Sequence, residues 1–423
     1  MRVLLIGNGG REHAMCRAIM TANPAPTLFI APGNPGTAEC GTNVPIKVDD
    51  IGALVAFARD EKIDLVIPGP ELPLVLGIGD ALDAAGIACC GPAAAAARLE
   101  GSKAFTREVT EGVPAPRWAK VTTVEALEAA LSDWEGVPVV KADGLASGKG
   151  VFLPDTIEEC LEAGKALLAG SLGDAGKTVV LEERLFGIEA SLFYACNGTK
   201  AVSLPHARDH KRLQDGDAGP NTGGMGAISP NPVITEAIQD QVFRECVLPT
   251  LEALEKSDAP FRGFLFGGFM LTENGPKLLE YNVRLGDPEA QAILPRLPDG
   301  AFLELCVRTA SGDLDDFELT FKGNATCAIV LAAAGYPASP RKGDEIHVQS
   351  RFATEGRWLI HAGTRSEDGR LVTAGGRVAA VVATESSPEL ARSEAYGGLD
   401  QVSFDGVQFR QDIGEVKTLG EER

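Results

Sequence analysis

The 423 residues include 39 Lys and Arg against 59 Asp and Glu, which gives a formal net charge of −20, and 44% of them are hydrophobic. This acidic balance argues against a nucleic-acid or membrane-surface partner, while a local basic pocket for a small anion remains possible. The length suggests about three domains. Nine cysteines without metal-ligand spacing form no disulfide framework in a chain this long, so we expect a cytoplasmic protein with small-molecule partners.

The chain begins with an apolar strand, a glycine turn and a helix, in "MRVLLIGNGGREHAMCRAIM". Strands at 27–34 and 63–71, with a helix between them from Asp50 to Glu61, then predict a parallel sheet. Glu12 occupies the third glycine position of the dinucleotide fingerprint, which disfavours a hydride-transfer role. The turn from Asn8 to Arg11 can seat an anion at a helix N-terminus, although Gly9 and Gly10 also suit a turn without a ligand.

Two residues that follow this first region are typical of a ligand site. Glu71 comes after an apolar strand, where open α/β folds place their ligands, although a glutamate in such a loop can also be merely solvated. Ser102 is a helix N-cap candidate, and Lys103 falls in the first turn. A cation there opposes the helix dipole, so a bound anion is an attractive explanation for it.

The stretch "VVKADGLASGKGV" predicts two strands joined by a flexible loop. Lys141 and Lys149 flank small residues whose backbone N–H groups are accessible, which suits a polyphosphate; the alternative is a solvated hairpin. The spacing does not match a Walker loop. Thr122 with Glu125, and Thr156 with Glu159, have capping-box spacing and predict a helix on each side of the loop. Together these elements predict a compact lid.

The region from 206 to 227 is charged and then glycine-rich, too polar to be predicted as core. It suits either a mobile surface loop or a loop that orders over a substrate, and His210 is predicted to hydrogen-bond and not to form a covalent intermediate. Further on, Glu280 and Asn282 alternate on a predicted strand, so their oxygens face one side and can share a metal ion with phosphates. Arg284 falls on the same face; a merely solvated strand is the alternative.

From about Gly323 the chain changes to short β-rich runs between turns. A helix opened by Ser387 and Pro388 follows, and a last strand is predicted at 407–414. These elements predict a separate α+β unit.

Several motifs resemble those of a known family. The motifs "GNGGREHA", "PGPELPLV", "LEGSKAFT", "KADGLASGKGV", "DHKR", "GPNTGGMGA" and "NVRLGDPE" occur in family order from Met1 to about Gly414 and resemble the glycinamide ribonucleotide synthetases, members of the ATP-grasp superfamily. The resemblance implies an N-terminal parallel α/β domain (1–100), an ATP-grasp domain (101–322) with a mobile lid (about 121–187), and a small α+β C-terminal domain (323–423).

The resemblance also implies the reaction: ATP-dependent ligation of glycine to 5-phosphoribosylamine through a glycyl phosphate, in purine biosynthesis. ATP and Mg²⁺ or Mn²⁺ would be required, the chain would act as a monomer, and no nucleic acid or membrane would take part.

Site residues follow from matching the family motifs position by position. The implied catalytic residues are Arg284, Lys149 and Lys211, and the implied metal ligands are Glu280 and Asn282. The implied ATP-binding residues are Lys103, Lys141, Gly144, Ser147, Gly148, Lys149, Gly150, Glu182, Glu183, Leu185 and Glu189, with Glu182, Glu183 and Leu185 at adenine and Glu189 at ribose. The implied substrate-binding residues are Asn8, Gly9, Gly10, Arg11, Glu71, Asp209, Lys211, Arg284 and Asp287.

One departure from the superfamily pattern concerns the metal. The strand at 264–271 carries no acidic residue, although many ATP-grasp enzymes place a ligand there, so metal binding would depend on the nucleotide. Two alternatives remain: another ATP-grasp carboxylate-amine ligase or a carboxylase, and a nucleotide-sensing protein without catalysis. The joint presence of Lys149, Glu280, Asn282 and Arg284 counts against the second.

Overall fold

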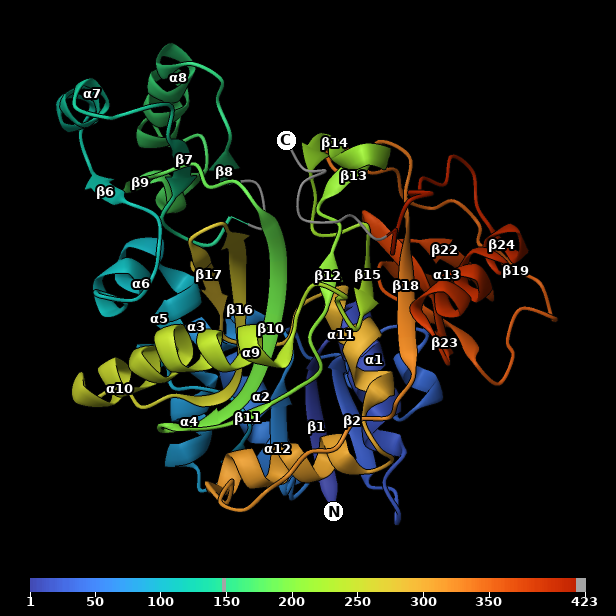
Figure 1. The fold of residues 1–423 in the computed structure, drawn as a ribbon. Helices are drawn as coiled ribbons and strands as arrows, with labels where there is room; N and C mark the ends of the chain where they lie inside the picture. The colour runs from blue at the N-terminus through green and yellow to red at the C-terminus, as the bar shows by residue number, and fades with distance from the viewer. Residues whose placement is uncertain (147–149, 416–423) are drawn as a thin grey trace.

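The computed structural model describes residues 1–146 and 150–415. It has an N-terminal domain, a central domain that carries a small outlying subdomain, and a C-terminal domain, coloured from blue to red in Figure 1. All nine cysteines are free thiols. Among the described residues, no helix is long and apolar enough to cross a membrane.

The N-terminal domain contains a five-stranded parallel sheet in the order β3-β2-β1-β4-β5, as predicted. Its central strand β1 is an unbroken apolar run, Val3 to Ile6, because both faces of the strand are covered. The Asp50 side chain caps α2 by accepting the Ala53 N–H. The elements are β1 (Arg2–Gly7), α1 (Gly10–Met20), β2 (Thr27–Pro32), β3 (Thr42–Asn43), α2 (Ile51–Asp60), β4 (Leu65–Pro68), α3 (Glu71–Val75), α4 (Ile78–Ala84), β5 (Ala88–Cys89) and α5 (Ala94–Gly101).

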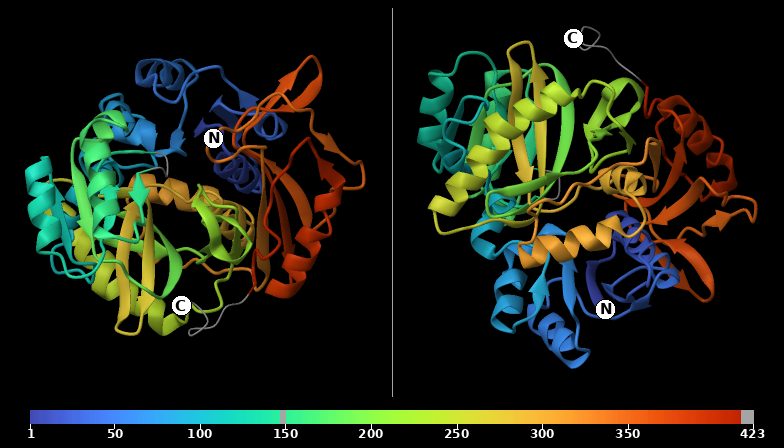
Figure 2. Two further views of the ribbon diagram at one scale, coloured as in Figure 1. Left: turned by 90° about the horizontal axis from the view of Figure 1, so that it is seen from above. Right: turned by 60° about the horizontal axis from the view of Figure 1, so that its bottom comes forward.

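The central domain is built on an antiparallel sheet in the order β11-β10-β16-β17. Side chains of β10 alternate between two cores: Phe193 joins the one with α1 and α12, and Leu192 the other. Helix α12 packs against β10, β16 and the N-terminal sheet, so it joins the two domains (Figure 2). The elements are α6 (Lys103–Val109), β10 (Ile188–Asn197), β11 (Lys200–Ser203), α9 (Glu236–Val242), α10 (Leu248–Lys256), β16 (Arg262–Thr272), β17 (Gly275–Asn282), α11 (Glu289–Ile293) and α12 (Ala301–Ser311).

The outlying subdomain, which we call the lid, has a core of its own and stands apart at the upper left of Figure 1. Its antiparallel sheet, in the order β6-β9-β7-β8, packs against two helices. Thr156 caps α8, as predicted, but α7 is capped by Thr123 and not by Thr122, because the Thr123 hydroxyl accepts the Ala126 N–H. The elements are β6 (Trp118–Val121), α7 (Val124–Ser132), β7 (Val139–Ala142), β8 (Val151–Phe152), α8 (Ile157–Leu168) and β9 (Val179–Glu182).

The C-terminal domain is less separate than the sequence predicts. Its sheet has the order β12-β15-β18-β23-β20, and two of these strands come from the polar region near 205–229. That region was predicted to lie outside the core, yet Met225 and Ala227 are fully buried, since β15 lies between β12 and β18. The additional elements are β12 (Arg208–Asp209), β13 (Arg212–Gln214), β14 (Ala218–Asn221), β15 (Gly226–Ser229), β18 (Ala325–Ala332), β19 (His347–Val348), β20 (Arg357–His361), β21 (Thr364–Glu367), β22 (Arg370–Thr373), β23 (Arg377–Glu385), α13 (Pro388–Tyr396) and β24 (Val402–Ser403).

The end of the chain also differs from the prediction. Ser387 caps α13 and Pro388 occupies its first turn, as expected. The prediction of a strand at 407–414 is wrong, because the described residues of this stretch make only a single bridge, from Gln408 to Ala332. The last strand among the described residues is the earlier β24. Turn residues Asp405 and Gly406 follow β24.

Candidate functional site

The charges of three lysines from separate parts of the chain influence one carboxylate, that of Glu280 near the end of β17. Burial by itself raises the pKa of Glu280, but Lys211, Lys141 and Lys103 together bring it below its ordinary value. Burial conversely lowers the pKa of Lys103, which Glu280 partly offsets. A concentration of cations around one ionised acid is suited to binding a polyanion.

The orientation of Glu280 follows from strand pairing. Glu280 is paired with Gly268 on β16, at an irregularity in the register, while Leu278 and Tyr281 enter the apolar core. Asn282 is tied to the same region because its Oδ1 accepts a hydrogen bond of 3.1 Å from Arg284. Glu280 and Asn282 therefore present side-chain oxygen atoms at the end of β17. The residue between them, Tyr281, belongs to the apolar core.

Lys141 is held by a buried charge network in the lid and α6. Its Nζ lies 2.5 Å from Glu182 Oε2, while Arg107 Nε donates to Glu182 Oε1 at 2.8 Å. Both oxygens of Glu182 are thus paired with cations, and its side chain is 3% exposed. Arg107 was missed in the sequence, since it looks like an ordinary polar residue of a short helix.

We expect Glu182→Gln to lower the free energy of unfolding at neutral pH and to flatten its dependence on acid. Although burial raises the pKa of Glu182, Lys141 and Arg107 lower it to about 2, so the ionised form stabilises the fold above pH 4.5 and this stabilisation is lost as pH falls toward 2. The shift corresponds to about 3 kcal/mol. Urea titrations between pH 7 and pH 3, followed by fluorescence of the lid residues Trp118 and Trp134, measure it.

The matched control is Glu128→Gln, in an exposed lid ion pair with Lys165. An exposed pair contributes about 0–1 kcal/mol, so this variant should follow the parent at every pH. If the stability difference for Glu182→Gln stayed constant from pH 5 to pH 3, the ionised pair would not be the cause.

The glycine loop is anchored to the start of α6. Asp143 Oδ1 accepts the Ala104 N–H at 2.7 Å and the Ser102 hydroxyl at 3.0 Å, and Ser102 caps the helix as predicted. This brings Lys103 beside the loop. A Cβ at Gly144 would lie 2.8 Å from the backbone of Ala175, so packing by itself requires that glycine. Gly150 is likewise in close contact with Ala146; Ser147, Gly148 and Lys149 lie outside the described residues.

Beyond β9, the chain connects the lid to β10. Glu183 Oε2 accepts the Arg117 N–H at 3.2 Å and lies 3.7 Å from Lys277, while Leu185 is half-buried. Glu189 on β10 forms a 3.0 Å ion pair with Lys211. Glu189 raises the pKa of Lys211, so this lysine is a permanent cation between Glu189 and Glu280.

Arg284 is fixed by two acids. Its Nη2 lies 2.6 Å from Glu100 Oε1, its Nε lies 3.3 Å from Glu71, and Glu100 also accepts the Val283 N–H. Burial raises the pKa of Glu100 to about 7 in spite of Arg284, so the ion pair is needed to keep this carboxyl charged. Glu71 is therefore an arginine partner here, and Glu100, which lies in the alanine-rich helix α5 and in the motif "LEGSKAFT", was missed as a site residue.

The turn into α1 differs from the prediction of free N–H groups. Glu12 Oε2 accepts the Gly9 N–H at 2.6 Å, and Glu12 Oε1 pairs with Arg11 Nε at 2.6 Å. The Gly9 amide is therefore already occupied, and an anion at this turn would have to rely on its other groups, including exposed Asn8. Gly10 lies close to the Gln291 side chain, because a Cβ there would lie 2.6 Å from Gln291 Nε2.

Asp209 and Glu289 form a pair of neighbouring carboxylates beside Lys211. Burial and the charge of Glu289 raise the pKa of Asp209 well above its ordinary value, while Lys211 opposes the change. Asp209 Oδ1 is buried and no described group hydrogen-bonds to it. Glu289 opens α11 and was missed, although it lies two residues beyond Asp287 in the same motif.

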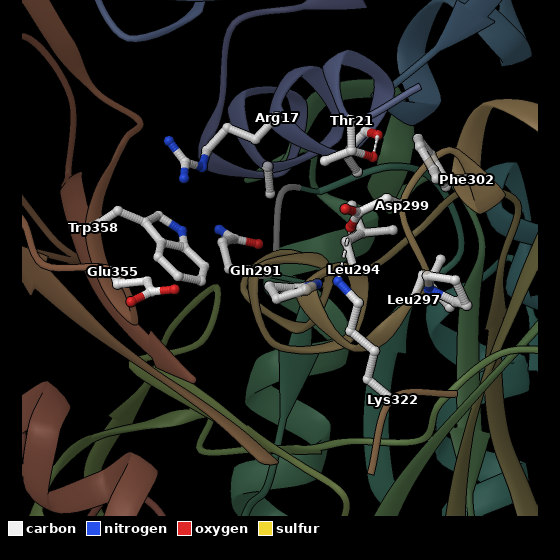
Figure 3. A pocket seen from close by; sticks show the side chains of 14 residues that line it. Arg17, Thr21, Gln291, Leu294, Leu297, Asp299, Phe302, Lys322, Glu355 and Trp358 are labelled. Atoms are coloured by element: carbon white, nitrogen blue, oxygen red, sulfur yellow. Dashed lines mark hydrogen bonds and ion pairs between the residues drawn. The ribbon is translucent and has the colours of Figure 1, made fainter. Parts of the chain in front are cut away.

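A cavity of about 310 Å³ lies away from this cluster, between α1, α12 and the C-terminal sheet. Figure 3 shows Gln291 pointing into it near Trp358, with Lys322 and Asp299 on the opposite wall. Arg17 stacks over the Trp358 ring at 4.9 Å, and Lys322 pairs with Asp299 at 2.9 Å. Arg17 and Lys322 thus already have partners, and the cavity lies at the junction of the three domains, apart from the centre described above.

The donor atoms at the end of β17 suit a divalent metal only in part. Among the described residues there is no group of three or more His, Cys, Asp or Glu side chains arranged to hold a metal ion. Glu280 and Asn282 supply two oxygens, and Mg²⁺ commonly takes one or two protein ligands together with phosphates and water. These residues fit a metal that is bound together with a nucleotide.

Comparison with known proteins gives one family for the whole chain. Family models of phosphoribosylglycinamide synthetase match residues 1–100 (N domain), 101–290 (ATP-grasp domain) and 326–416 (C domain). The chain is 46% identical over 422 residues to the phosphoribosylamine–glycine ligase of Vibrio parahaemolyticus, covering 98% of both chains. It is 44% identical over 418 residues to that of Brucella melitensis, covering 98% of this chain and 97% of the relative.

Solved structures agree with the expected architecture. The crystal structure of the Thermotoga maritima phosphoribosylamine–glycine ligase superposes with a TM-score of 0.86 and 36% identity, covering 98% of this chain and 100% of the other. A biotin carboxylase domain from Hydrogenobacter thermophilus, bound to MgADP, shares the fold with a TM-score of 0.74 at 16% identity, covering 96% and 91%. The predicted three-domain α/β and α+β fold is confirmed.

Proposed function

Because the chain belongs to the phosphoribosylglycinamide synthetase family, we propose that the residues around Glu280 and Arg284 carry out the family's ATP-dependent ligation. The reaction joins glycine to 5-phosphoribosylamine and gives glycinamide ribonucleotide, ADP and phosphate, a step of purine biosynthesis. The observation that carries the assignment to these residues is the convergence of Lys103, Lys141 and Lys211 on Glu280.

The chemistry explains why a cationic cleft without a nucleophilic side chain suffices. A carboxylate is a poor electrophile, so the γ-phosphoryl group of ATP is first transferred to the glycine carboxylate. The ribosylamine nitrogen then attacks the acyl carbon of glycyl phosphate, and phosphate leaves. Both steps depend on positioning and charge neutralisation, which fixed lysines and an arginine supply.

For ATP, the proposal assigns the phosphates to Lys103, Lys141 and the loop Gly144–Gly150, together with Ser147, Gly148 and Lys149. Adenine is assigned to the segment of Glu183 and Leu185, whose backbone groups follow the lid strand. Glu182, whose ion pairs orient Lys141, is assigned to the same adenine site, because each carboxylate oxygen can accept a second hydrogen bond. Glu189 orients Lys211 and is assigned to the ribose hydroxyls.

For the other substrates, the ribosylamine is assigned to the wall formed by Asn8 to Arg11 and Asp287. Asp287 is next to that turn, because a Cβ on Gly9 would lie 3.4 Å from its Oδ2. Arg284, held by Glu71, and Lys211, beside Asp209, occupy the space between this wall and the ATP site, where glycine must be activated.

Mg²⁺ or Mn²⁺ would be held by Glu280 and Asn282 together with the phosphates. The ion supplies charge neutralisation at the transferring phosphoryl group when bound. The chain's own contribution is to hold these two oxygens at the end of β17 and to keep Glu280 ionised through its lysine neighbours.

The remaining features of the proposal concern the protein as a whole. We place domain boundaries at 1–100, 101–322 and 323–423 with a lid at about 121–187, and expect a cytoplasmic monomer. The interleaving of β12 and β15 with β18 means that the last two domains should not fold well when separated.

The test is the dependence of ADP formation on substrates. ADP should form steadily only when glycine, 5-phosphoribosylamine and ATP are all present, and glycinamide ribonucleotide should accumulate with it. Bicarbonate in place of glycine serves as the control for the carboxylase alternative. ADP formation that depends on bicarbonate, or ATP binding without turnover, would refute the ligase assignment.

A further inference from the structure

Two residues of the C-terminal domain hold the glycine-rich segment of the central site. The Tyr336 hydroxyl accepts the Gly223 N–H at 3.0 Å, and Arg377 Nη1 donates to the Gly223 carbonyl oxygen. The guanidinium also packs flat against this residue, since a Cβ on Gly223 would lie 3.0 Å from Arg377 Cζ. Both backbone polar groups of one residue are thus bound by another domain.

From Gly223 the connection continues to Lys211. Thr222 donates its backbone N–H and its hydroxyl to the Lys211 carbonyl oxygen, each at 2.8 Å, and the same hydroxyl accepts the Gly224 N–H at 3.0 Å. The Lys211 side chain in turn pairs with Glu189 and acts on Glu280. Any displacement of Gly223 therefore changes the position from which Lys211 reaches the ATP side of the site.

Arg377 also makes a second connection, toward the N-terminal domain. It donates to the backbone oxygen of Asp287, and its Nη2 lies 3.2 Å from Asp287 Oδ2. Asp287 Oδ1 accepts from Gln291 Nε2 at 2.7 Å, and the carboxylate is in contact range of Gly9 and Gly10. One guanidinium therefore fixes both the segment that carries Lys211 and the acid that borders the α1 turn.

We propose that Arg377 and Tyr336 are positioning residues that hold the ATP-side and ribosylamine-side halves of the site in register, so that the acyl phosphate and the amine meet. The inference rests on the proposed function. Neither residue needs to touch a substrate, since each acts through Gly223 or Asp287. An arginine suits the task because its planar fork can bond two carbonyl oxygens and a carboxylate at once, which a lysine cannot do.

Loss of this positioning should weaken the coupling between ATP consumption and product formation, and not only lower the rate. If the amine is misplaced, water can attack the acyl carbon of glycyl phosphate instead. The bond from the acyl carbon to the bridging phosphate oxygen then breaks, phosphate leaves, and glycine is regenerated with loss of a proton. ATP is consumed without product, so the ratio of ADP to glycinamide ribonucleotide rises above one.

The experiment measures ADP and glycinamide ribonucleotide in parallel for the full-length parent, Arg377→Lys and Tyr336→Phe. For Arg377→Lys we expect the ratio to rise to about two or more and the KM for 5-phosphoribosylamine to rise about tenfold, with ATP affinity unchanged. Tyr336→Phe removes one hydrogen bond and should shift the same quantities in the same direction by a smaller factor.

Two matched controls come from the same domain. Tyr396 also accepts a backbone N–H through its hydroxyl, from Ile413 at 2.9 Å, and donates to the Arg410 carbonyl oxygen, so its hydroxyl bonds neither Gly223 nor Asp287. Arg365 forms an exposed ion pair with Glu367. Tyr396→Phe and Arg365→Lys should therefore keep a ratio of one, even if Tyr396→Phe lowers thermal stability.

Each outcome either supports the positioning role of Arg377 and Tyr336 or overturns it. A ratio of one and an unchanged ribosylamine KM in both folded variants would overturn the proposal, as would an equal rise of the ratio in Tyr396→Phe. If Arg377→Lys does not fold, Tyr336→Phe alone decides. Failure of the proposed function is distinguishable, because the parent protein itself would then form no glycinamide ribonucleotide.

Discussion

Glu280→Gln is expected to leave the protein folded and to lower kcat by about a thousandfold, since loss of metal and charge stabilisation at a transferring phosphoryl group costs on this order. The amide keeps the shape of the side chain but removes the negative charge that Lys211, Lys141 and Lys103 surround. It also replaces an anionic oxygen donor by a weaker neutral one. Metal and nucleotide should therefore bind less tightly together, while all three lysines keep their positive charge toward phosphate.

The measurement is steady-state turnover over a range of Mg²⁺ concentrations, with thermal unfolding recorded on the same samples. Glu273→Gln provides the control, because Glu273 is an exposed glutamate in the turn between β16 and β17 and loses the same charge. Near-normal turnover of Glu280→Gln at saturating Mg²⁺ would show that this carboxylate has no role at the phosphates.

Arg284→Lys is expected to lower kcat/KM for glycine by about a hundredfold or more, because a planar fork is replaced by a single point charge. Arg284 bonds Glu100, Glu71 and Asn282 at the same time, and these contacts fix the direction of the guanidinium. A lysine can satisfy one of the acids at best. Direct ATP binding, measured by calorimetry without glycine, should change much less than the kinetics.

A matched variant distinguishes a specific role of Arg284 in the site from the simple loss of an ion pair. Arg262 bonds both oxygens of Asp83, at 3.0 and 2.8 Å, in a contact between the N-terminal and central domains. Arg262→Lys should cost stability without a change in kcat/KM for glycine. Equal kinetic losses in the two variants would indicate that Arg284 acts through general stability alone.

Short-range signals in the chain determined much of the architecture. The strand, glycine turn and helix at the N-terminus, the Ser102 cap and the Ser387-Pro388 helix start were predictable, since each depends on neighbours within one turn or strand. The alternation of Glu280 and Asn282 likewise needs only strand geometry. The one-residue error at Thr122 shows the limit, because adjacent threonines have equal capping chemistry and the packing of α7 selects Thr123.

Tertiary structure decided the pairings that join distant parts of the chain. β15 entered a core because it pairs with β18, about a hundred residues later, and no local pattern in its polar surroundings indicates that partner. The same holds for Arg107 with Glu182 and for Glu100 with Arg284, whose members look like unremarkable surface residues in the sequence.

The contrast has a physical reason. Propensity, caps and hydrophobic periodicity act between neighbours, so the chain by itself determined which segments become strands and helices and which family motifs they carry. The charge of a buried side chain depends on what the folded chain places within a few ångströms of it. Only the tertiary structure therefore decided that Glu182 pairs with Lys141 and that Arg377 connects Gly223 with Asp287.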